Sequence, residues 1–398
     1  MMGLAMYKIN EKLRQVTWLI HFQATQTGAT LRPSEVKPKL DRFLENRLKS
    51  IGQSIDPKWK LRDTGALDYK MRITVAKDDK LKTRKIDSKR HRNGMFLGDN
   101  DNGNRQFIRH TKSLNFQIVS RHKVLVDTIN KELELFFLTH NFGARQSKGY
   151  GSFLLEGTPE DNQDELFENI AKVYPVFLWG DLNFEREVKD VYNLMKSGIN
   201  NNRDGKRDPK KVLKGFLRTA YPNNRGYGSE KKFMKEQLGV FEETSDPSYK
   251  FVRVMLGLAE QYEFPHINKN SYFKVKDGTK EEIQRFQSPV LIKVIKQDEE
   301  FKRSKKNTQN RQEKSDREKN LVLFLPQKIP GKLLDREFSF YKRGVGEPLL
   351  LKTPKHFDTV DFLIKFQKWI AVSRHPIASN FNKGRAKLFI HEKQVKIK

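Results

Sequence analysis

Apolar and polar residues alternate in three short stretches near the start of the chain, and each alternation is typical of a half-buried strand. The alternating stretches are residues 16–22, 69–75 and 114–118, the last with an upstream extension from Phe107. Apolar residues recur at helical spacing in 40–51 and 125–137, and a short apolar run follows at 153–155. The predicted order is strand, helix, strand, strand, helix, strand, which is that of a ferredoxin-like unit with both helices on one sheet face.

The opposite face of this predicted sheet carries polar side chains. They are Thr17, His21, Gln23, Lys70, Arg72, Asn115 and Gln117. An RNA recognition motif displays stacking aromatic residues on that face, and this chain has none at these positions. We therefore expect no base stacking on the central strands.

The second half of the chain repeats a similar order with longer insertions. An apolar run at 174–179 precedes largely helical text, and apolar strands in 287–297 and 321–325 precede a helical pattern at 360–372 and a last strand, GRAKLFI. We predict an α+β protein with two ferredoxin-like (RRM-like) domains in tandem, 1–172 and 173–398, the second with helical insertions. Two segments with few apolar anchors are predicted to be mobile, a basic insertion at 77–105 and a loop at 297–319.

A glycine-rich stretch, NFGARQSKGYGSFLLE at 141–156, lies between the second predicted helix and the fourth strand. Its glycines are Gly143, Gly149 and Gly151, and they enclose Arg145, Gln146, Ser147 and Lys148. Glycine allows close backbone approach to a ligand, and these side chains suit phosphates; a helix-ending turn followed by a hairpin is the alternative. Tyr150 stands where a Walker loop needs lysine, and the loop ends a helix instead of opening one, so nucleotide hydrolysis is not predicted.

Charge indicates the class of partner. The 398 residues contain 78 Lys plus Arg against 49 Asp plus Glu, a net charge of +29, which favours a nucleic acid as partner. Cysteine is absent, which excludes disulfides and thiolate metal sites, and no signal peptide, lipidation motif or membrane-spanning run is recognisable. We expect a folded, cytoplasmic protein without cofactor or membrane partner.

Candidate binding residues follow from the loop and the polar sheet face. The predicted RNA-binding set is Arg32, Lys37, Lys39, Lys70, Arg72, Gly143, Arg145, Gln146, Ser147, Lys148, Gly149, Tyr150 and Gly151. Lys37 and Lys39 have a solvated helix face as their alternative, and Tyr150 either stacks on a base or plugs the strand end. No histidine pair has metal-ligand spacing, so no metal is predicted. His21 is a candidate base for metal-independent RNA cleavage, with a hydrogen-bonded strand histidine as the alternative.

Three segments resemble one protein family. FGARQSKGYGS at 142–152 resembles the glycine-rich loop of the RAMP superfamily of CRISPR proteins. TLRPSEVKPKLDRFL at 30–44 is similar to the first helix of the first-numbered RAMP subunit of the Cmr complex, with its L-R-x-x-x-[IV]-K pattern at Leu31, Arg32, Val36 and Lys37. RFQSPVLIKVI at 285–295 is similar to a segment found late in RAMP proteins.

The resemblance implies a function. It implies a two-domain, ferredoxin-like subunit of a type III CRISPR effector that contacts guide RNA, target RNA or both, beside other effector subunits that cleave RNA. Two alternatives stay open: a metal-independent endoribonuclease that processes CRISPR repeat RNA, and a structural adaptor subunit.

Overall fold

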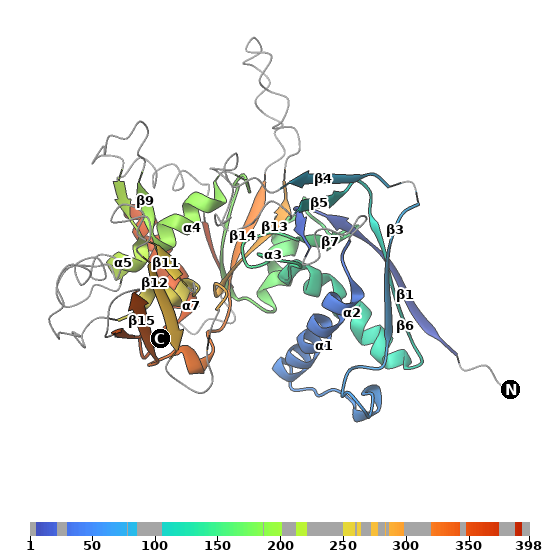
Figure 1. The fold of residues 1–398 in the computed structure, drawn as a ribbon. Helices are drawn as coiled ribbons and strands as arrows, with labels where there is room; N and C mark the ends of the chain where they lie inside the picture. Colours follow the sequence, from blue (N-terminus) through green and yellow to red (C-terminus); the bar gives the residue numbers. More distant parts are fainter. Residues whose placement is uncertain are drawn as a thin grey trace, which may run out of the picture. The chain divides into compact units, whose positions relative to one another are not determined.

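A computed structural model describes the fold (Figure 1). The described residues are 5–21, 30–77, 79–85, 106–185, 187–200, 212–220, 250–258, 261–263, 272–277, 283, 286–297, 320–342, 348–373 and 387–391.

The N-terminal part forms a four-stranded antiparallel sheet in the order β3-β6-β1-β7. Its strands are β1 (Tyr7–Gln15), β3 (Lys70–Val75), β6 (Leu114–Ser120) and β7 (Phe153–Leu155). Two helices, α1 (Pro33–Ser50) and α2 (Lys123–Thr139), cover one face (Figure 1). The core between them is continuous, because the inward residues Ile9, Ile73 and Phe116 share one cluster with Leu40 and Leu133. The predicted order of these four strands and two helices is found, with differences at the first strand and between β3 and β6.

The first strand of the sheet is earlier than the alternation at 16–22 predicts. In β1, Glu11 and Gln15 share the inward-facing side with Ile9 and Leu13, so polar residues interrupt its apolar pattern. Residues 16–21 are all buried, and only β2 (Leu19–Ile20) is a strand there. Neither side of this segment faces solvent. Its alternation of apolar and polar residues therefore does not mark one buried and one exposed face of a sheet.

A second, three-stranded sheet has the order β2-β5-β4. β4 (Leu81–Lys85) and β5 (Gln106–His110) pair antiparallel, and β5 also pairs with β2. The stretch 77–105 was predicted to be a mobile insertion, but it contains β4; residues 86–105 lie outside the described residues. The predicted extension from Phe107 is a separate strand, β5, and not part of β6.

The later strands form a second four-stranded sheet in the order β13-β14-β8-β17. They are β8 (Val176–Gly180), β13 (Val290–Lys296), β14 (Leu321–Pro326) and β17 (Lys387–Ile390). Numbered along the chain, the strands of this sheet and of the N-terminal sheet have the same order: second, third, first, fourth. The strands predicted in the second half are thus confirmed, while the loop predicted at 297–319 lies outside the described residues from 298 on.

The rest of the second half contains more strands than its helical pattern predicts. The helices are α3 (Gln163–Ala171), α4 (Val188–Lys196), α5 (Phe216–Ala220) and α7 (Thr359–Val372). A hairpin joins β9 (Gly198–Asn200) to β10 (Val212–Lys214). A further sheet combines β11 (Gln261–Glu263), β12 (Tyr272–Asp277), β15 (Glu337–Lys342) and β16 (Leu349–Lys352). Short 3₁₀ turns, η1 (Pro57–Trp59), η3 (Val252–Leu256) and η5 (Gly331–Leu333), complete the described elements. The expectation of a largely helical middle is therefore wrong for its described part.

Contacts divide the chain into two compact units. Unit 1 comprises Met1–Arg186, Ile292–Leu325 and Phe389–Lys398, and unit 2 comprises Glu187–Leu291 and Pro326–Leu388. Most of the second four-stranded sheet therefore belongs to unit 1, together with the first. The boundary predicted near residue 172 follows the repeated strand order and stays a prediction. None of the helices in the described ranges has the length and apolar character needed to span a bilayer.

Candidate nucleic-acid interface

The glycine-rich loop between α2 and β7 needs its glycines for packing within the chain. Gly143, Gly149 and Gly151 have φ values of +78°, +88° and +67°, a region that glycine adopts readily. A side chain at Gly143 would come within 2.7 Å of the Ile20 carbonyl oxygen, and one at Gly151 would collide with the Phe142 carbonyl. These glycines therefore allow close approach to neighbouring parts of the same chain.

Most backbone amides of the loop donate within the chain. Gly143 N donates to Glu35 Oε1 at 2.5 Å, and Ala144 N donates to the Ile20 carbonyl at 2.8 Å. The amides of Lys148, Gly149 and Gly151 also donate to backbone carbonyls. The close approach allowed by the glycines is therefore to the chain itself, and these five amides already have acceptors. Ser147 is 7% exposed, and its carbonyl accepts from Ile292 N at 3.1 Å, so this hydroxyl is not on the surface either.

Strand β13 supplies further partners for the loop and the residues next to it. Asn141 Nδ2 donates to the Ile292 carbonyl at 2.7 Å, and Ser152 Oγ donates to the Val294 carbonyl at 2.6 Å. Lys293, which is fully buried, donates from Nζ to the carbonyls of His140 at 2.9 Å and Phe153 at 3.1 Å. The loop thus joins the first four-stranded sheet to the second within unit 1. Sequence reasoning missed this role, although a lysine within the apolar run VLIKVI was a visible signal.

Lys39 supports the loop from α1. Its Nζ donates to Gln146 Oε1 at 2.6 Å, to the Asn141 carbonyl at 3.0 Å and to Glu35 Oε1 at 3.1 Å. Burial lowers the pKa of Lys39, and the neighbouring Glu35 carboxylate opposes that shift. Lys39 and Gln146, both in the predicted RNA-binding set, therefore bind each other and the loop.

Lys37 belongs to a different group of contacts on α1. Its Nζ donates to Asp41 Oδ2 at 3.0 Å and to the Leu67 carbonyl at 2.8 Å, and it lies 3.8 Å from the centre of the Tyr69 ring. Burial, with the nearby Asp41 carboxylate, raises the pKa of Tyr69. Lys37 thus ties α1 to the segment before β3. In the structure, Lys37 therefore has an intramolecular role that differs from both alternatives considered for it, an RNA contact and a solvated helix face.

Tyr150 plugs the end of the strand and does not offer its ring to a base. It is 5% exposed, stacks on Phe107 at a centroid distance of 5.6 Å and meets Phe184 edge-on at 5.3 Å. Burial raises the pKa of the Tyr150 hydroxyl; the Glu185 carboxylate adds to the shift, and Arg145 and then Arg84 oppose it. The base-stacking alternative for Tyr150 is therefore corrected.

Cationic side chains lie around this plug. Arg145 and Lys148 are half-buried on the loop, and Arg145 has a positive φ of +57°. Arg84 of β4 lies over the Trp18 and Phe107 rings, 5.1 and 4.9 Å from their centres, with Nη2 3.4 Å from Glu185 Oε1. Sequence reasoning missed Arg84, because the pairing of β4 with β5 was not visible in the pattern. Arg32, also in the predicted set, is half-buried at the N-cap of α1.

Lys70 and Arg72 lie apart from the loop. Both are exposed on β3, which is an edge strand, and β6 and β1 separate it from β7. Three strand spacings correspond to roughly 14 Å. The predicted convergence of these two cations with the loop is therefore not seen.

Of the histidines near the loop, His21 is buried and His140 is half-buried. His21, the candidate base, is 3% exposed, and a base must reach the proton that it abstracts. Burial lowers the pKa of His140 to about 4, against a hydrogen bond with the Phe136 carbonyl. In the described ranges, no group of three or more His, Asp or Glu side chains could hold a metal ion.

Comparison with protein families decides the relationship. The model of the Cmr1 N-terminal domain matches residues 6–199, and that of the Cmr1 C-terminal domain matches residues 213–388. The chain belongs to the Cmr1 family. The predicted resemblance to the first-numbered RAMP subunit of the type III Cmr complex is thereby confirmed.

Solved structures add more distant likenesses. Apo Cmr1 from Pyrococcus furiosus is 10% identical, with a TM-score of 0.41, over 96% of this chain and 99% of that chain. A chain of the type III-B Cmr-beta complex bound to cognate target RNA is 15% identical, with a TM-score of 0.27, over 38% of this chain. This chain spans 60% of that chain's length. No curated protein sequence matches significantly.

Proposed function

We propose that this chain is an RNA-binding subunit of a cytoplasmic type III CRISPR ribonucleoprotein. It contacts guide RNA, target RNA or both, assembles with other effector subunits and leaves RNA cleavage to them. The observation that carries the proposal is the position of Arg145 and Lys148 on a loop that Lys39 and β13 hold by hydrogen bonds. The chain also has a net charge of +29. Membership of the Cmr1 family supports the same assignment.

The binding chemistry lies in the side chains of the loop. Because five loop amides already have acceptors in the chain, the guanidinium of Arg145 and the ammonium of Lys148 supply the contacts to phosphate. Arg84 is close enough to influence the same Tyr150 hydroxyl as Arg145, and it extends the cationic surface onto β4. Such contacts hold an RNA backbone in position without reading its sequence.

We also propose that the sheets β3-β6-β1-β7 and β13-β14-β8-β17 belong to ferredoxin-like RAMP domains. The shared strand order, second, third, first, fourth, supports this assignment. In the first sheet, α1 connects the first two strands and α2 connects the last two, as that fold requires.

The salt dependence of RNA binding tests the loop. We expect Arg145→Ala/Lys148→Ala to weaken binding of single-stranded RNA and to reduce the slope of log K against log salt by about 1.4, that is about 0.7 for each lost phosphate contact. Fluorescence anisotropy between about 50 and 200 mM salt measures this slope. The matched control is Arg42→Ala/Lys49→Ala, which removes two exposed cations from α1. Equal slopes in the two variants would overturn the loop assignment.

The absence of catalysis is tested separately. We expect the purified protein to leave repeat RNA and target RNA intact, both with divalent cations and with EDTA. His21 is buried, so it offers no accessible base to a scissile phosphate in this conformation. Specific cleavage in EDTA that disappears in His21→Ala would establish the endoribonuclease alternative instead.

A further inference from the structure

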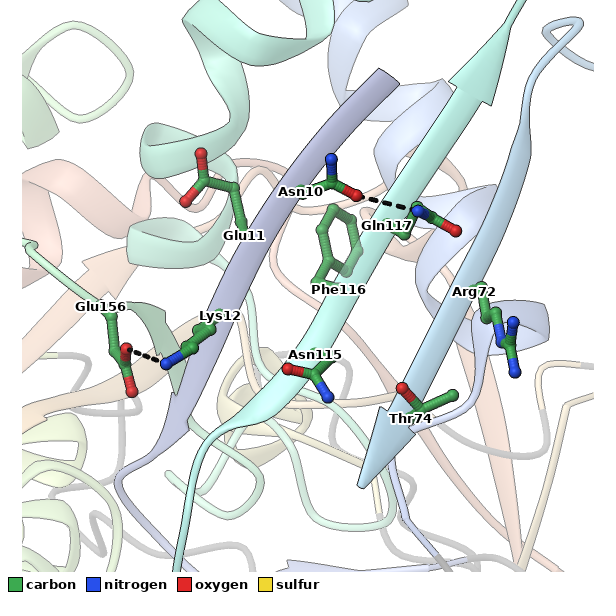
Figure 2. A pocket seen from close by; sticks show the side chains of 9 residues that line it. All are labelled: Asn10, Glu11, Lys12, Arg72, Thr74, Asn115, Phe116, Gln117 and Glu156. Carbon is green, nitrogen blue, oxygen red and sulfur yellow. Dashed lines mark hydrogen bonds and ion pairs between the residues drawn. The ribbon is translucent and has the colours of Figure 1, made fainter. Parts of the chain in front are cut away.

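The face of the first sheet that α1 and α2 leave uncovered contains a polar hollow (Figure 2). Its volume is about 640 Å³, and two acidic residues, Glu11 of β1 and Glu156 after β7, belong to its lining. The other polar lining residues are Asn10, Lys12, Arg72, Thr74, Asn115 and Gln117. These residues come from the three strands β1, β3 and β6. Arg72 and Thr74 lie on the edge strand farthest from β7, whereas Glu156, at the end of the glycine-rich stretch, lies beside Lys12 at the other side of the hollow.

Strand register arranges the lining in two rows. Arg72, Gln117 and Asn10 are cross-strand partners in one row, and Thr74, Asn115 and Lys12 are partners in the next. Each row therefore places a carboxamide of β6 at its centre and a cation at one end. Two exposed lysines, Lys8 and Lys70, flank the first row from either side of Val119.

The amides in the first row are oriented by a contact with each other. Gln117 Nε2 donates to Asn10 Oδ1 at 2.8 Å (Figure 2). This contact orients both carboxamides. The Asn10 amide N–H groups and the Gln117 side-chain oxygen take no part in it, so they can face a ligand. In the second row, Lys12 Nζ lies 3.8 Å from Glu156 Oε2, and both side chains are exposed. The carboxylate of Glu156 therefore offsets part of the positive charge of Lys12. The first row thus presents a donor and an acceptor side by side, next to the guanidinium of Arg72.

We propose that this face binds a short single-stranded RNA segment, with base edges on the carboxamides and phosphates on Arg72 and Lys70. The inference rests on the proposed function, because it adds a second RNA contact to that of the loop. A carboxamide offers a donor and an acceptor that match the edge of a base, and guanidinium groups bind phosphate oxygens. Because the aromatic residue of the lining, Phe116, is buried, bases are distinguished there by hydrogen bonding and not by stacking.

The lining is a poor match for a protein partner. The centres of protein interfaces are enriched in aromatic residues and methionine and depleted of charged residues. Phe116 is the one aromatic residue at the hollow, and its side chain is 1% exposed because it belongs to the core beneath the sheet. The acidic residues Glu11 and Glu156 lie on the side of Lys12, whereas Arg72 with the flanking Lys70 and Lys8 provides the positive charge that complements an RNA backbone beside the carboxamides.

Base preference in full-length protein tests this assignment. Labelled octamers of A, C and U are titrated into wild type, Asn115→Leu/Gln117→Leu, and the control Asn46→Leu/Gln53→Leu on the exposed side of α1 and the turn after it. We expect the first variant to bind the preferred octamer about tenfold or more weakly, at an unchanged salt slope, since no charge is removed. The control should bind as wild type. Gln117→Glu, of nearly the same size, serves as a second variant should the leucine pair perturb folding.

The outcomes separate this inference from the proposed function. Wild-type affinity and base preference in both face variants would overturn the inference, and loss of association with partner Cmr subunits in those variants would assign the face to a protein instead. If Arg145→Ala/Lys148→Ala still flattens the salt slope in that case, RNA binding at the loop stands. Unaltered binding in loop and face variants alike would remove both.

Discussion

Lys293 links the two sheets β3-β6-β1-β7 and β13-β14-β8-β17 through one side chain. It is completely buried in β13, and its ammonium contacts two backbone carbonyls from the α2–β7 region. Burial lowers the pKa of Lys293 well below its usual value, and the positive charge of Arg14 lowers it further. A methionine would fill similar space but would leave both carbonyls without this donor.

The lowered pKa of Lys293 predicts a specific pH dependence. Between the folded pKa and the unfolded value of 10.5, the unfolded chain holds a proton that the folded chain lacks. The free energy of unfolding therefore rises with pH in that window, by up to about 1.4 kcal/mol per unit. We expect wild type to gain stability relative to Lys293→Met from pH 7 to 10, as measured by urea unfolding. The exposed Lys70→Met variant should show no such trend, and a flat difference for Lys293→Met would contradict the shift.

At the scale of elements, α1 braces two different neighbours through lysines two positions apart. Lys39 reaches the glycine-rich loop, and Lys37 reaches Asp41 and the segment before β3. Both side chains are similarly half-buried, at 23% exposure, so they form a matched pair. The loop conformation thus depends on a helix about 100 residues earlier in the chain as well as on its own glycines.

Replacing these lysines is expected to separate the two roles. In Lys39→Met, the Asn141 carbonyl and Gln146 lose a donor, so amides 143–149 should exchange hydrogen faster. In Lys37→Met, exchange should instead increase around residues 67–70, where Leu67 loses its contact. Hydrogen exchange with mass spectrometry on full-length protein distinguishes the two patterns. Identical patterns in the two variants would show that the lysines stabilise α1 as a whole and not its separate neighbours.

The helices α1 and α2 and the strands β3, β6 and β7 could be predicted because each presents one apolar face to one core. Strand β1 could not, since Glu11 and Gln15 interrupt its inward face. The loop glycines were recognised as a conformational requirement, but their close neighbours were not. Spacing along a chain reports the local backbone, whereas Ile292 and Val294 are about 140 to 150 residues away from their partners in the loop. Local pattern therefore could not show that β13 contacts Asn141 and Ser152.

At the scale of the whole molecule, unit 1 is assembled from three separate stretches of chain. The first ends at Arg186, the second begins at Ile292 and the third begins at Phe389. The intervening parts form unit 2. The first stretch thus contains the entire first sheet, but it lacks β13, whose backbone accepts from Asn141 and Ser152.

This assembly predicts that the N-terminal part is not stable as an isolated domain. A fragment of residues 1–172 loses β13, so buried polar groups of the loop region lose their hydrogen-bond partners. It also loses Phe184, which packs on Tyr150, so apolar side chains become exposed. A fragment of residues 1–186 regains Phe184 but still lacks β13. We expect both fragments to unfold at lower temperature than the full chain and to bind an apolar dye, with 1–172 the less stable. Cooperative unfolding of 1–172 at the temperature of the full chain, without dye binding, would instead establish the domain boundary near residue 172 and make the contacts with β13 dispensable.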